Sequence, residues 1–193
     1  MSVNLLETIQ QNLGYPPLQK VDPNTQQVTA DKNGSTEDRF SQAGIPAVLT
    51  GLYEYVQTDE GAEEILKADS STGWISKIFV GDKKEVVQKI ADYGNRSYEE
   101  TDTKMNAIAN EAVKLVKENL AGDADIKAVK LFLSNQKNNI LPHLLPALKM
   151  GEVLHDNALD DNTNKMEGPV SSLIQNIGNI FSSPVTDEEI KNK

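Results

Sequence analysis

The chain has no cysteine and only two histidines, so few of its side chains are suited to nucleophilic or metal chemistry. His155 is followed directly by Asp156, and Asp160 and Asp161 lie one helical turn further on. A carboxylate beside an imidazole can orient the ring as a metal ligand or as a proton-transfer group. The pattern is also typical of a solvated histidine beside an acidic loop, the interpretation we prefer. His143 is interpreted as a capping or partly buried residue.

The acidic segment 152–167 invites comparison with the calcium-binding loop of an EF-hand. Frames that begin at Asp156 and at Asp160 both lack the glycine needed at the sixth position. The first frame ends correctly at Glu167 but has Ala158 at the third position, where a ligand is needed. The sequence therefore predicts no site of this type and leaves weak cation binding by the segment open.

Paired acids are a second candidate for chemistry, since two neighbouring carboxyl groups can act as acid and base. Glu63–Glu64 and Glu99–Glu100 are such pairs, but pairs arise freely among 29 acidic residues. Both pairs are predicted to lie in the first turn of a helix, where the helix dipole favours negative charge. We therefore interpret them as helix-start residues.

The leading functional prediction is a non-catalytic helical interaction or scaffolding module with an unknown protein partner. No phosphate-binding loop, nucleophile elbow or dinucleotide fingerprint occurs in the sequence, and no catalytic, cofactor or metal residue is assigned. A metal-binding or hydrolytic protein using the segment around His155 is one alternative. A carrier of a small apolar ligand, with a pocket between helices near Trp74 and Phe79, is another.

Charge and hydropathy narrow the classes of partner. The net charge of −10 repels a phosphate backbone, so nucleic-acid binding is not expected. No stretch reaches the roughly 18–20 apolar residues that span a bilayer, and the start of the chain lacks the pattern of a secretory signal. Together with the absence of cysteine, this favours a cytoplasmic protein without membrane insertion. Self-association is left open.

The elements that must position these residues are all predicted to be helices. Apolar residues recur at i, i+3, i+4 and i+7 in segment after segment, and no segment alternates with period two. The sequence predicts an all-α, multihelical array of about eight or nine helices. They include the segments 3–13, 43–56, 59–68, 82–94, 97–122, 123–133 and 140–150, and a last helix from Pro169.

Composition divides the chain into four parts. Residues 1–14 are an N-terminal helix, and 15–37 form a polar linker or long loop with few apolar residues. Residues 38–181 are the main helical domain, and 182–193 are a frayed tail. Within the domain, Trp74 and its apolar neighbours are interpreted most simply as a core anchor.

Two apolar segments of the domain resemble each other. Residues 45–52 (IPAVLTGL) and 141–148 (LPHLLPAL) share an aliphatic–proline start and a small residue before a final leucine. Each proline is expected to begin a buried helix, where its missing N–H costs nothing. Gly51 and its counterpart Ala147 are small enough to let a neighbouring helix approach. An internal helical repeat is therefore an expectation.

The order of these motifs resembles the YidB-like family of bacterial domains of unknown function. The resemblance covers residues 43–151, extending toward 181, and includes the Gly61–Ala62 pair and Gly94 followed by Ser97. It is carried by the motifs IPAVLTGL, DEGAEEIL, GWISKIFVG, VVQKIADYGNRSYEETDTKMNAIANEAVKLV and ILPHLLPALKMG. It implies a multihelical array in a small cytoplasmic bacterial protein. The family has no established active site, so the resemblance assigns no functional residues.

Overall fold

The structure is a computed structural model that describes residues 3–22, 35–68, 73–120 and 122–154. In these ranges the chain is helical without a β-strand, which confirms the all-α prediction. Seven helices have five or more residues there, fewer than the eight or nine expected, and two further helices are single turns. The helix expected from Pro169 lies outside the described residues.

Seven helices build the described part of the chain, and short turns follow them. The seven helices are α1 (Leu5–Asn12), α2 (Thr36–Tyr55), α3 (Asp59–Lys67), α4 (Trp74–Ile78), α5 (Lys83–Gly94), α6 (Tyr98–Asn119) and α7 (Ile126–Ser134). The short turns are α8 (Lys137–Ile140), the 3-10 turns η1 (Leu141–His143) and η2 (Pro146–Leu148), and α9 (Met150–Val153).

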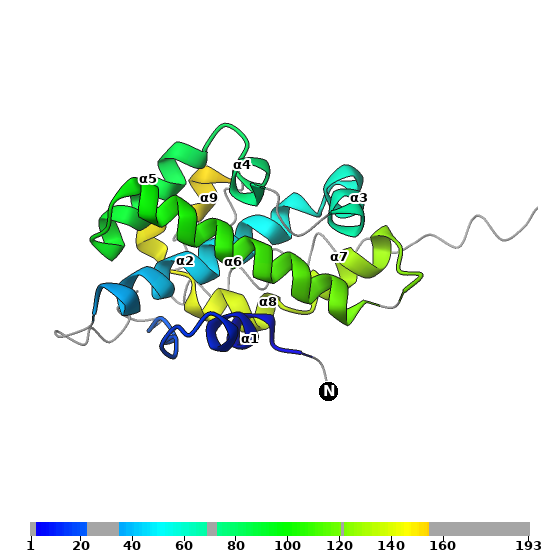
Figure 1. Cartoon of the computed structure of the whole chain (residues 1–193), viewed down its shortest axis with the longest axis horizontal. Helices are drawn as coiled ribbons and strands as arrows, with labels where there is room; N and C mark the ends of the chain where they lie inside the picture. Colours follow the sequence, from blue (N-terminus) through cyan, green and yellow to red (C-terminus); the bar gives the residue numbers. More distant parts are fainter. Residues whose placement is uncertain (1–2, 23–34, 69–72, 121, 155–193) are drawn as a thin grey trace, which may run out of the picture.

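The helix α2 lies at the centre of the arrangement (Figure 1). The longest helix, α6, crosses in front of α2, and α4 and α5 pack beside both. At one end of the molecule α7 packs against α3, while α1 lies along the opposite side from α4 and α5, next to α8. Buried apolar side chains from all these helices form one hydrophobic cluster.

Side-chain caps fix where the helices begin. Ser35 and Asp38 form a capping box at the start of α2, and Ser97 accepts a hydrogen bond from the N–H of Glu100 at 3.2 Å, as its spacing predicts. Such caps satisfy N–H groups that have no partner within the helix. At the far end of α1 the chain leaves the helix through Gly14, whose φ of +71° is easily adopted only by glycine.

The structure corrects the predicted start of α2. The helix begins at Thr36, so Pro46 lies inside it and not in its first turn. The capping box at Ser35 supplies the earlier start, and Phe40 and its neighbours extend the buried face. Burial of this face offsets the backbone hydrogen bond that the proline removes.

The structure also corrects the prediction for residues 140–150. Pro142 does not begin a buried helix: the segment forms the two 3-10 turns, separated by extended Leu144 and Leu145 with ψ of 123° and 120°. A residue before proline is pushed out of the helical region, which accounts for Leu145. Residues 45–52 and 141–148 thus have different backbone structures, and the internal repeat is not confirmed.

The apolar cluster around Trp74 is a core anchor, as expected. Trp74 and Phe79 are 1% and 2% exposed. Gly51 of α2 allows this packing, since a Cβ atom there would lie 2.5 Å from two carbons of the Phe79 ring. In the described part of the chain, the helices are too short or too polar to cross a bilayer.

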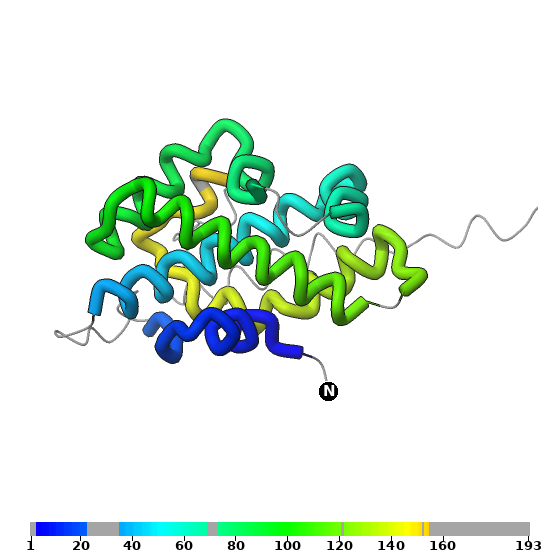
Figure 2. The backbone as a smooth tube through the Cα atoms, viewed as in Figure 1, coloured from blue at the N-terminus to red at the C-terminus, as the bar shows by residue number. Residues whose placement is uncertain are grey.

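The segment 15–22 contains no helix, yet it packs on the core. Tyr15 and Val21 are buried in the main apolar cluster. Figure 2 shows residues 3–22 running beside α8 and η1. The predicted boundaries at 37 and 181 stay predictions, because residues 23–34 and 155–193 are outside the described ranges.

Candidate functional site

The first candidate site from the sequence cannot be placed. His155, Asp156, Asp160 and Asp161 lie outside the described residues, as do both EF-hand frames. Within the ranges that the structure covers, no three His, Asp or Glu side chains gather as they would around a metal ion. The metal hypothesis at His155 therefore stays a prediction.

His143 is half-buried in η1, in agreement with its interpretation as a partly buried residue. Its Nδ1 donates to the carbonyl oxygen of Asn139 at 3.0 Å. Burial lowers the pKa of His143 because the charged ring is poorly solvated there, and Lys20 adds to the effect. The hydrogen bond to Asn139 and the charge of Glu7 oppose it. The His143 ring is thus neutral at pH 7, and its hydrogen bond to Asn139 stabilises the turn at η1.

Three of the four paired acids form ion pairs: Glu63 with Lys67, Glu64 with Lys77 and Glu100 with Arg96. Glu99 and Glu100 lie in the first turn of α6, as predicted, but the first turn of α3 holds Asp59 and Glu60. The prediction for Glu63–Glu64 was wrong: α3 begins at Asp59, at the predicted position, but its first turn ends before Glu63, so both glutamates lie in its second turn.

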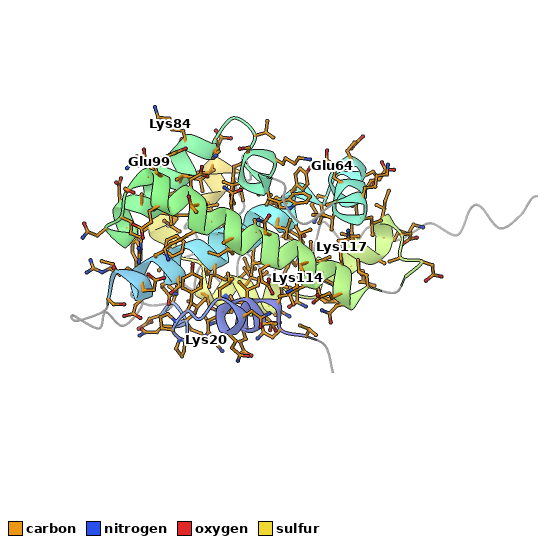
Figure 3. The ribbon with its side chains drawn as sticks, viewed as in Figure 1. Lys20, Glu64, Lys84, Glu99, Lys114 and Lys117 are labelled. Atoms are coloured by element: carbon orange, nitrogen blue, oxygen red, sulfur yellow. The ribbon has the colours of Figure 1, made fainter. Side chains whose placement is uncertain are left out.

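Glu64 is the centre of a small cluster that joins three helices. It accepts hydrogen bonds from the Tyr55 hydroxyl at 2.7 Å and from Lys77 Nζ at 2.6 Å, and Figure 3 labels it on α3. The bonds from Lys77 and then Tyr55 lower the pKa of Glu64, while burial and Glu64 raise the pKa of Tyr55. Lys77 Nζ lies 5.4 Å from the centre of the Trp74 ring. The cluster holds α2, α3 and α4 together.

Arg96 is the centre of a second, more buried cluster. Its side chain is 10% exposed, and its two terminal nitrogens bind Glu37 and Glu100. Lys104 Nζ also reaches Glu37, at 2.9 Å, and the guanidinium lies over Phe40 at 5.7 Å. These contacts join the start of α2 to the start of α6. The sequence contained the Arg96–Glu100 spacing, but only the fold brings Glu37 to them.

A shallow depression of about 410 Å³ runs along α5. Its lining carries both signs of charge. Within it Lys89 forms an ion pair with Glu85 at 2.8 Å, and the Gln88 amide donates to Asp92 at 2.7 Å. Because the lining comes from one helix and the turn before it, no groups from separate elements converge there. The depression therefore lacks the geometry of a reaction site.

Residues 15–22, which we call the docked segment, pack against α2 and η1. The buried side chain of Gln42 accepts from the N–H of Gln19 at 2.8 Å and donates to the carbonyl of Gln19 at 2.9 Å. Its Nε2 is also 3.4 Å from the carbonyl oxygen of His143. Two residues later, the N–H of Val21 donates to the carbonyl of Pro142 at 2.8 Å. Gln42 of α2 and Pro142 of η1 thus bind the backbone of the docked segment.

Tyr15 anchors the other end of the docked segment. Its ring centre lies 5.8 Å from that of Phe40, and Lys104 Nζ lies 5.7 Å from the Tyr15 ring. Its carbonyl accepts from Gln10 Nε2 at 2.8 Å. Burial, and secondly the charge of Glu37, raise the pKa of Tyr15 to about 12, so the phenol stays neutral at ordinary pH.

Comparison with protein-family models, with curated proteins and with solved structures finds no match to this chain. The resemblance to YidB-like domains therefore stays a prediction from the motifs.

Proposed function

We propose that this chain is a non-catalytic helical interaction module that binds a protein partner. The observation that carries the proposal is how the described charged side chains are used. Several of them tie one helix to another: Arg96 joins α2 and α6, Lys77 joins α4 and α3, Lys83 joins α5 and α6, and Lys130 joins α7 to Asp59 of α3. A reaction site needs such groups to converge on an open cleft.

Exposed apolar side chains and the docked segment supply surface for a partner. Val80, after α4, and Leu131, on α7, are 76% and 63% exposed and are the exposed large hydrophobic residues of the described ranges. Gln19 of the docked segment is exposed as well. We also propose a cytoplasmic location and a relationship to YidB-like domains, on the composition and the motifs alone.

The two alternative functions have less support. A carrier of apolar ligands needs space near Trp74 and Phe79, but Phe79 packs directly on Gly51 and both aromatic side chains are buried. A metal-dependent function at His155 is tested by melting the chain with and without calcium, magnesium or zinc. A specific ion stabilises the fold by RT ln(1 + [L]/Kd), which is about 2.7 kcal/mol at a concentration of 100 Kd.

Site-specific photo-cross-linking tests the proposed interaction. A photoreactive amino acid replaces Val80, Leu131 or Gln19, one at a time, in cells that produce the chain. We expect at least one position to form an adduct with a single protein identified by mass spectrometry. The purified partner is then expected to bind the unaltered chain with a Kd of about 10 µM or tighter.

Competition with excess unaltered chain is the control, and it must suppress the adduct. If none of the three positions gives an adduct that can be competed away, although the variants show the same helical circular dichroism as the parent, the interaction proposal is wrong.

A further inference from the structure

We draw no further inference here: the strongest candidate, the exposed apolar side of α7 at Leu131, carries no proposal, since nothing in the described part of the chain shows what covers it.

Discussion

Single residues decide how closely the helices of this chain approach one another. Gly51 is the tightest such position between α2 and α4, because a Cβ atom there would meet the Phe79 ring and lie 2.7 Å from Ile78 Cγ2. Overpacking a core typically costs about 1–3 kcal/mol. We expect Gly51→Ala to lower the free energy of unfolding by this amount in a urea titration.

Gly122→Ala is the matched control for that substitution, since a Cβ atom at Gly122 meets no atom within 4 Å. Its expected effect is below about 0.5 kcal/mol. Equal losses in the two variants would show that the contact between Gly51 and Phe79 is not tight.

The burial of His143 predicts how the stability of the folded chain depends on pH. Burial places its pKa below the ordinary value of 6.5, so the folded chain binds a proton less readily than the unfolded chain. Stability from this group is present above pH 6.5 and is lost as the pH falls from there toward the folded pKa. We expect the NMR signals of the His143 ring to titrate below pH 6.5, with assignment by His143→Gln. A midpoint above 6.5 would contradict the burial described for this ring.

Sequence reasoning at this scale succeeded where a residue type has one common role. Trp74 was identified as a core anchor and Gly51 as a close-approach position, and both are so placed. Gln42 was missed because a glutamine carries no local signal for binding a backbone 23 residues away. His143 was placed correctly as partly buried, but its partner Asn139 was not foreseen.

Ion pairs between helices add to the apolar packing, and Arg96 tests their contribution at the scale of elements. Arg96→Ala removes a nearly buried cation that binds Glu37 and Glu100. We expect a loss of about 2 kcal/mol in unfolding free energy, less than for a fully buried pair because both glutamates are partly exposed. Chemical denaturation followed by circular dichroism measures it.

Lys67→Ala is the surface control for the ion pair. Lys67 and Glu63 are also spaced i, i+4, but their side chains are 70% and 52% exposed. An exposed pair of this kind contributes about 0.3–0.5 kcal/mol. If Lys67→Ala and Arg96→Ala had equal effects, burial of Arg96 would add nothing.

Helix starts were predictable from the sequence only where the signal was local. The start of α6 was predicted at 97, next to its observed start at Tyr98, whereas the start of α2 was placed too late because Pro46 was interpreted as a first-turn residue. Residues 140–150 were expected to be helical from their apolar spacing, but two prolines four residues apart prevent a regular helix. Buried leucines alone do not distinguish the two structures.

At the scale of the whole molecule, one apolar interior collects the N-terminal residues with the rest of the chain. Leu5 bonds to Gln136 across 131 positions of sequence, and Val21 bonds to Pro142. The all-α class followed from the helical period of the apolar residues, because the long helices each bury one face. The packing of residues 15–22 did not follow, because a polar segment with three spaced anchors has the composition of a loop.

Native-state amide hydrogen exchange of the unaltered chain tests this single-interior description most directly. The amide of Ile9 in α1 is predicted to show the same opening free energy as those of Val48 in α2 and Ala112 in α6, within about 0.5 kcal/mol, because all three then exchange through one global unfolding. Exchange of Ile9 at the rate of an unstructured peptide, while Val48 and Ala112 remain protected, would contradict it.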